Sequence, residues 1–107
     1  MTQMYAYQMD VAQPMAMWDA VHAEVLKVTG HAMPDGCLMH MATATATGFR
    51  VTEVWDSHEA ADRFVSEVRR PIIERIGGAD AVAAGPPPVE ELTLHALLSV
   101  ARSDAPV

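Results

Sequence analysis

The order in which strand-like and helix-like spacing of apolar residues alternates is the strongest constraint on how this chain folds. Alternation with a period of two is typical of a half-buried strand, and apolar residues recurring every three to four positions are typical of an amphipathic helix. Each change of period marks a boundary between elements. The predicted elements are a strand at 4–9, a helix at 14–30, strands at 37–45 and 48–55, a helix at 57–77 and a strand at 90–100.

Residues that begin and end helices lie at the predicted boundaries. Pro14 fits the first position of a helix, where its missing N–H is not needed, and Gly30 is a natural stop. Ser57 is a good N-cap for the second helix. Pro71 should kink or restart that helix, and Gly77-Gly78 should end it, leaving residues 79–88 as a loop.

This order predicts an α+β domain of ferredoxin-like βαββαβ type. Two helices would cover one face of a four-stranded antiparallel sheet. At 107 residues there is room for one domain, spanning residues 1–107 with an ordered core of about 3–101. Several strands are apolar on both faces, as Leu38, Met39 and Met41 illustrate. A sheet with two apolar faces needs two covers, so we expect a homodimer with the sheets packed back to back.

Charge and cysteine content exclude several classes of protein. A net charge of −7 without a basic cluster argues against nucleic acid or an anionic membrane as a partner. Cys37 is the only cysteine, so no disulfide can form within the chain. The first residues lack the pattern of a signal peptide, and no stretch is apolar enough to span a membrane, so we expect a cytoplasmic protein.

Residues 48–64 carry a resemblance to a known family. The strand running into Val54-Trp55-Asp56-Ser57, then Glu59-Ala60 and an aromatic residue a turn later, is similar to the third strand and second helix of the dimeric α+β barrel superfamily. The most similar branch is the antibiotic-biosynthesis-monooxygenase-like group. The resemblance implies a dimeric ferredoxin-like fold with a ligand cavity between sheet and helices. Members include cofactor-free oxygenases of aromatic polyketides, haem-degrading enzymes and polyketide cyclases.

The sequence disfavours a bound cofactor or metal. The haem-degrading relatives have a tryptophan and a histidine where this chain has Phe64 and Glu74, so haem degradation is not expected. Five scattered histidines without HxH or HxxxH spacing argue against a metal site. Nucleotide-binding and serine-hydrolase motifs are also missing from the sequence.

The hairpin between residues 45 and 48 predicts a candidate catalytic pair. If its turn is centred between Ala46 and Thr47, His40 faces Glu53 across the hairpin, and Leu38 faces Trp55. The family resemblance implies that this tryptophan points toward the cavity. A histidine and a carboxylate inside an apolar pocket can hold or pass a proton near neutral pH. The alternative is a structural pair that merely satisfies itself within the sheet.

Further residues are candidates for substrate binding beside this pair. His22 lies on the flank of the first helix and would overhang the pocket. His95 could face either the cavity or the dimer interface. The remaining candidates from this reasoning are Tyr7, Leu38, Trp55 and Phe64.

Two functions of different class follow. The first is a cofactor-independent enzyme, either a monooxygenase or a cyclase/isomerase, that acts on an aromatic or polyketide-like molecule. The second is a non-catalytic protein that binds a small apolar or aromatic molecule in the same pocket. Eight methionines suit an adaptable apolar pocket in both cases.

Overall fold

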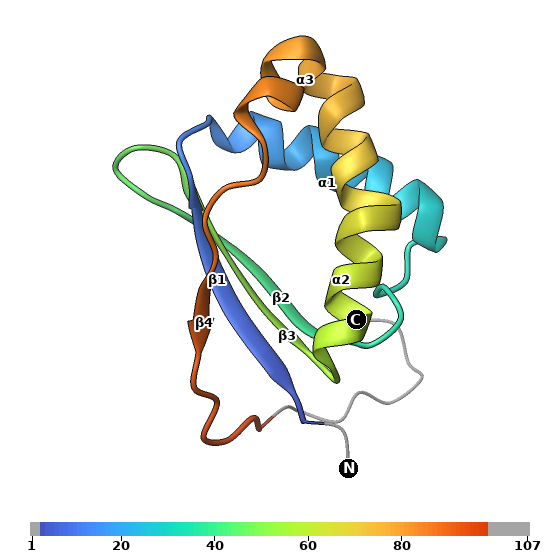
Figure 1. Ribbon diagram of the computed structural model, residues 1–107, viewed down its shortest axis with the longest axis vertical. Helices are drawn as coiled ribbons and strands as arrows, with labels where there is room; N and C mark the ends of the chain where they lie inside the picture. Colours follow the sequence, from blue (N-terminus) through green and yellow to red (C-terminus); the bar gives the residue numbers. More distant parts are fainter. Residues whose placement is uncertain (1–2, 99–107) are drawn as a thin grey trace.

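The protein has the predicted order of elements, with both helical runs on one side of a four-stranded antiparallel sheet (Figure 1). The computed structural model describes residues 3–98. The strands follow the spatial order β2-β3-β1-β4. The ferredoxin-like α+β fold is therefore confirmed. The elements are β1 (Tyr5–Val11), α1 (Met15–Thr29), β2 (Cys37–Ala44), β3 (Phe49–Trp55), α2 (His58–Phe64), the π-helical turn η1 (Val65–Arg69), α3 (Arg70–Ala84) and β4 (Glu90–Leu92).

The residues predicted to bound the helices do so with small shifts. Pro14 lies at the N-cap of α1, one position earlier in the helix than predicted, and Gly30 ends α1. The Ser57 hydroxyl accepts a hydrogen bond from the Ala60 N–H at 3.1 Å, which caps α2 as predicted. None of the helices within residues 3–98 has the length and apolar character needed to cross a membrane.

The second helical run differs from the prediction at its far end. Pro71 has no N–H to donate, and the chain widens just before it into the π turn η1, which confirms the expected break. Gly78 leaves helical geometry with φ 63°, but the chain re-enters a helix and continues to Ala84. Residues 79–84 are thus helical, and their prediction as loop is wrong. The Arg70 guanidinium donates to the Ala81 carbonyl at 2.7 Å, which ties this last segment back to the helix.

The last strand is shorter than predicted. β4 contains only Glu90–Leu92, so the prediction of a strand through residues 93–98 is wrong. Leu92 already faces Ala6, the second residue of β1, so the residues after it have almost no β1 left to pair with. The remaining predicted strand residues, 99–100, and the predicted ordered core to 101 lie outside the described residues.

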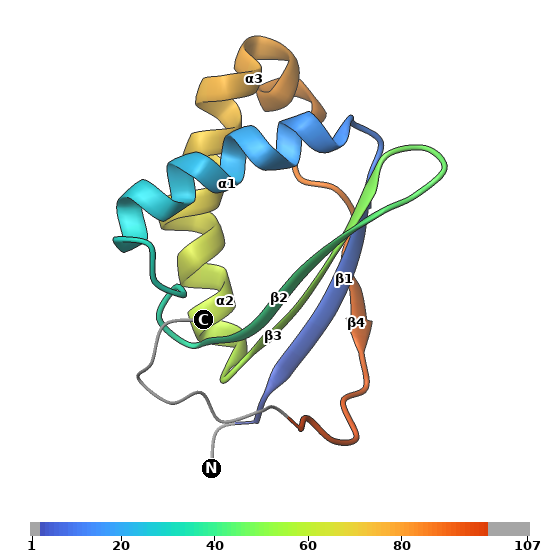
Figure 2. The same cartoon turned by 180° about the vertical axis from the view of Figure 1, so that it is seen from behind.

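The two faces of the sheet carry different side chains in the rows that run across the strands. Cross-strand pairing aligns Met39, Val54, Ala6 and Leu92 in one apolar row on the outer face. Figure 2 shows that α1, α2 and α3 all lie on the opposite, inner side. There Trp55 is fully buried, and it forms a small core with Tyr7, Ala60 and Ala61. The inner face is therefore the one that can build an enclosed site.

Candidate functional site

The centre of the inner face is a row of three polar side chains from three neighbouring strands. The register pairs His40 of β2 with Glu53 of β3, and Glu53 with Tyr7 of β1. The predicted facing of His40 and Glu53 is confirmed, and the His40 Nδ1 lies 2.7 Å from Glu53 Oε2. Glu53 is fully buried in the middle of this row. A buried carboxylate of this kind needs several hydrogen-bond donors.

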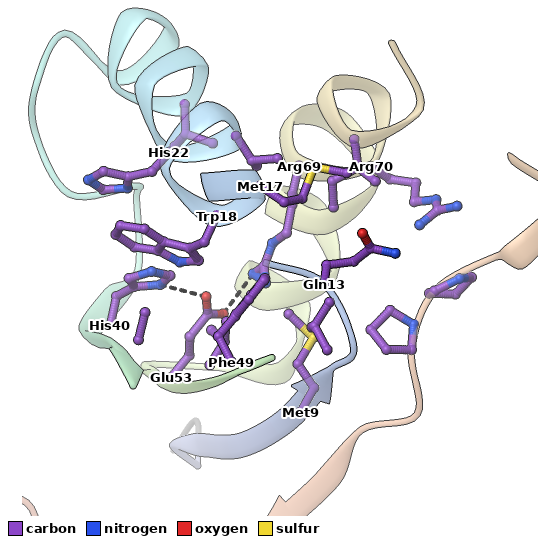
Figure 3. A pocket seen from close by; sticks show the side chains of 18 of the residues that line it. Met9, Gln13, Met17, Trp18, His22, His40, Phe49, Glu53, Arg69 and Arg70 are labelled. Atoms are coloured by element: carbon purple, nitrogen blue, oxygen red, sulfur yellow. Dashed lines mark hydrogen bonds and ion pairs between the residues drawn. The ribbon is translucent and has the colours of Figure 1, made fainter. Parts of the chain in front are cut away.

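Four donors converge on the Glu53 carboxylate. His40 bonds to Oε2, whereas Oε1 accepts from the Trp55 Nε1 at 3.0 Å and from the Arg69 Nη2 at 2.7 Å. The Tyr7 hydroxyl also donates to Oε1. Arg69 reaches in from η1, as Figure 3 shows, and donates to the Tyr7 hydroxyl oxygen at 2.9 Å as well. We call these five residues the Glu53 cluster.

The cluster keeps Glu53 ionised. Burial alone would raise its pKa, but the His40 hydrogen bond, the Arg69 charge and the Tyr7 hydrogen bond together hold that pKa below its usual value. Burial raises the pKa of Tyr7 far above its usual value, so Tyr7 stays a neutral donor. Of the predicted acid–base pair, Glu53 is therefore a fixed negative charge.

The position of the proton on His40 follows from its partner. An ionised carboxylate only accepts, so the neutral imidazole carries its hydrogen on Nδ1, and Nε2 presents a lone pair. The Nε2 atom is buried and has no hydrogen-bond partner among residues 3–98. An imidazole oriented by a carboxylate, with a free Nε2, is the arrangement of a general base.

This histidine belongs to the wall of a large cavity between the sheet and the helices. The cavity has a volume of about 830 Å³ and is lined mostly by apolar side chains. The Trp18 ring of α1 stacks over His22 with centroids 4.4 Å apart and over His40 at 5.7 Å. Burial and the nearby His40 lower the pKa of His22, against a weaker opposing effect of Asp19. The arrangement suits a planar, largely apolar ligand.

The structure brings most of the predicted site residues together. Trp55, Phe64 and His22 line the cavity, and the rings of Trp55 and Phe64 pack 5.3 Å apart. Tyr7 lies within the Glu53 cluster and lines a second, adjoining cavity of about 560 Å³. Four of the predicted substrate-binding residues therefore gather around His40 and Glu53.

Two of the predicted residues lie elsewhere. A β-bulge between Cys37 and Met39 places Cys37, not Leu38, opposite Trp55, and Leu38 is 45% exposed outside the cavity wall. Next to the bulge, the Gly36 carbonyl accepts a hydrogen bond from the Asp56 N–H, and Gly36 approaches Ala60 so closely that a Cβ would lie 2.7 Å from the Ala60 methyl. His95 follows the short β4 and is exposed, away from both cavities.

Arg69 and Trp18 are site residues that the sequence reasoning missed. Arg69 is absent from the predicted site residues, yet its side chain is only 9% exposed. A signal was available, because Arg69 falls between Val65 and Ile72 on the apolar side of its helix. An arginine in that position, facing a strand with a buried glutamate, indicates an ion pair. Trp18 gave no such signal, since an apolar residue on a helix face is ordinarily core.

No cluster of three or more metal-ligating side chains occurs within the described part of the chain.

No family model and no curated protein matches the sequence. Solved structures do match the fold. A candidate antibiotic biosynthesis monooxygenase from Caulobacter crescentus is 20% identical with a TM-score of 0.57, over 85% of this chain and 89% of that one.

Two further solved structures agree. A candidate antibiotic biosynthesis monooxygenase from Chloroflexus aurantiacus is 23% identical with a TM-score of 0.55, over 92% of this chain and 100% of that one. SnoaB, a cofactor-independent oxygenase from Streptomyces nogalater, is 17% identical with a TM-score of 0.51, over 89% and 94%. The predicted resemblance to the antibiotic-biosynthesis-monooxygenase-like group is thereby confirmed at the level of the fold.

Proposed function

We propose that this chain is a cofactor-independent enzyme that acts on a small aromatic or polyketide-like molecule, with His40 as its general base. The observation that carries the proposal is the Glu53 cluster, which fixes one His40 nitrogen and leaves Nε2 without a protein partner at the wall of an apolar cavity. The fold shared with SnoaB, a cofactor-independent oxygenase, supports this kind of chemistry.

The chemistry begins with removal of a proton from a phenol or enol of the substrate by His40 Nε2. The imidazolium that forms lies against an ionised carboxylate 2.7 Å away, which stabilises its positive charge. Arg69, Trp55 and Tyr7 hold that carboxylate in place, so it does not turn away when the charge changes. In a monooxygenase the deprotonated substrate reduces dioxygen and bonds to it, the resulting peroxide takes the proton back from His40, and loss of water leaves a quinone. In a cyclase the deprotonated carbon attacks a carbonyl of the same molecule, whose C=O π bond becomes an alkoxide that takes the proton from His40. In an isomerase His40 returns the proton to another atom.

The test is turnover of a panel of phenolic and polyketide-like aromatics by the wild type and by His40→Gln, under air and under nitrogen. We expect the variant to lose about 100-fold or more in rate, as loss of a general base does. Turnover only under air identifies an oxygenase, and turnover in both atmospheres a cyclase or isomerase. His58→Gln is the matched control, since His58 is outside both cavity walls and its side chain is 61% exposed.

Two results would contradict the proposal. Normal turnover by His40→Gln would remove His40 as the base. A ligand that binds the wild type and is recovered unchanged in both atmospheres would favour the non-catalytic binding protein.

We also propose that the enzyme is a homodimer in which a second copy covers the outer face of the sheet. The apolar row of Met39, Val54, Ala6 and Leu92 lies on that face. Ala6 and Val54 are already buried within the single chain, whereas Met41 beside the row is 45% exposed. Helices cover only the inner side, so an identical sheet is the simplest apolar partner for this one.

A further inference from the structure

The large cavity has a second polar end, remote from the Glu53 cluster. Figure 3 shows His40 at one side of the pocket and the Arg70 and Gln13 side chains at the other. Between them lie apolar side chains, among them those of Met9, Met17 and Phe49. A ligand that fills this cavity would thus contact polar groups at both of its ends.

Arg70 keeps donors free at this end. Its Nε donates to Glu74 at 3.1 Å and one Nη2 hydrogen goes to the Ala81 carbonyl at 2.7 Å. A guanidinium has further N–H groups, and these have no partner within residues 3–98. The Arg70 side chain is only 17% exposed, whereas the Glu74 side chain that pairs with it is 39% exposed. Water therefore screens the charge of Arg70 less than it screens the charge of Glu74.

Arg69 and Asp10, two other charged residues that line the cavity, already have partners, whereas Asp19 forms no ion pair within residues 3–98. Arg69 is bound to Glu53 and Tyr7, and Asp10 is bound to Arg50 through two hydrogen bonds. Figure 3 shows the Gln13 side chain on the same side of the pocket as Arg70, and its amide can donate a hydrogen bond. An arginine with unused donors and an amide that lines the same cavity are suited to a carboxylate.

We propose that Arg70 and Gln13 form an anion subsite, which binds a carboxylate on the end of the aromatic ligand opposite the hydroxyl that faces His40. The proposal rests on the proposed function for the placement of that hydroxyl. It adds a substrate class: an elongated aromatic acid with an ionisable hydroxyl at one end and a carboxylate at the other.

The experiment compares binding of two fluorescent probes, 6-hydroxy-2-naphthoate and 2-naphthol, which differ by the carboxylate. We expect the wild type to bind the carboxylate probe about tenfold or more tightly, as a charge-assisted hydrogen bond provides. Arg70→Gln should abolish this preference and leave 2-naphthol binding unchanged. Arg75→Gln is the matched control, because it removes the same charge from α3 at a side chain that is 65% exposed and outside the cavity wall.

A second variant guards against misfolding of Arg70→Gln, since Arg70 also holds Ala81. Gln13→Glu changes an exposed side chain and should reverse the preference by repelling the carboxylate probe. A preference that persists in both variants overturns the subsite and leaves the role of His40 untouched. Normal turnover by His40→Gln, with the preference for the carboxylate probe intact in the wild type, overturns only the role of His40 as base. If neither probe binds at millimolar concentration, both proposals are wrong.

Discussion

The two faces of the central sheet bury different kinds of side chain. Glu53 and Trp55 of β3 point to the inner face, where a buried carboxylate is satisfied by a histidine, a tyrosine, a tryptophan and an arginine. Thr52 and Val54, their neighbours in sequence, point to the outer face, where the register aligns apolar side chains across all four strands. The difference lies in η1, which supplies Arg69 to the inner face only. A buried charge in a sheet is stable where the helical layer packed against it supplies a side chain of opposite charge.

The largest effect that tests this contrast should come from Glu53→Gln. The change keeps the volume but leaves the buried Arg69 without its counter-ion, so we expect a loss of about 3–5 kcal/mol in the free energy of unfolding. Thr52→Val, at the next position but on the outer face, should change stability by about 1 kcal/mol or less. Urea denaturation of both variants measures the difference. Equal effects would mean that the Glu53 cluster does not stabilise the inner face.

The outer face is tested by Met41→Glu. If a second copy covers this face, the variant would bury an unpaired charge in the dimer, and dissociation should become about 100-fold easier. Sedimentation velocity across a dilution series measures it. Val28→Glu places the same charge on α1, where Val28 is 62% exposed, and should leave the dimer intact. A wild type that sediments as a monomer at micromolar concentration would end the dimer proposal.

A smaller effect is expected in how strongly Glu53, on the inner face, and Asp10, on the outer face, make the stability of the protein depend on pH. The pKa of Glu53 is lowered on folding, so the folded chain binds fewer protons and its stability falls as the pH drops below the ordinary value of 4.5. The Arg50 hydrogen bond also lowers the pKa of Asp10 on the outer face, but the Asp10 side chain is 63% exposed to solvent. Solvent screens that pair, so Asp10→Asn should change the acid dependence of stability much less than Glu53→Gln.

This comparison is measured by urea denaturation at several pH values between about 3 and 7, the range over which carboxylates titrate. The slope of stability against pH should flatten in Glu53→Gln and stay close to that of the wild type in Asp10→Asn. An equal flattening in both variants would show that burial does not distinguish the two carboxylates.

The sequence was sufficient to predict contacts within one regular element or hairpin, where the number of residues between two positions determines whether they meet. His40 meets Glu53 because both belong to one hairpin whose turn sets the pairing up to Met39 and Val54, and Ser57 caps α2 through a local hydrogen bond. Such contacts depend on few residues, all close in the chain. The same holds for the break at Pro71, which follows from a missing N–H.

Two kinds of contact could not be predicted in this way: those shifted by an irregularity in a strand, and those made by the helices against the sheet. The predicted place of Leu38 is wrong because one extra residue in β2 shifts the pairing. Of the two places predicted for His95, the cavity is wrong because β1 ends before the last strand could extend. Arg69 reaches Glu53 from a helix whose rotation depends on the π turn before Pro71. The charge state of Glu53 was left open for the same reason, since its decisive partner was not known.

The β-bulge at Leu38 has a consequence for how such a chain can diverge. The loop 30–36 and the start of β2 border the cavity near Cys37, whereas His40 sits past the bulge in regular register with Glu53. One residue can therefore be gained or lost at the bulge without moving the histidine, because the irregularity absorbs the change in length. Selection can vary the shape of the cavity rim while the pairing of His40 with Glu53 is inherited unchanged.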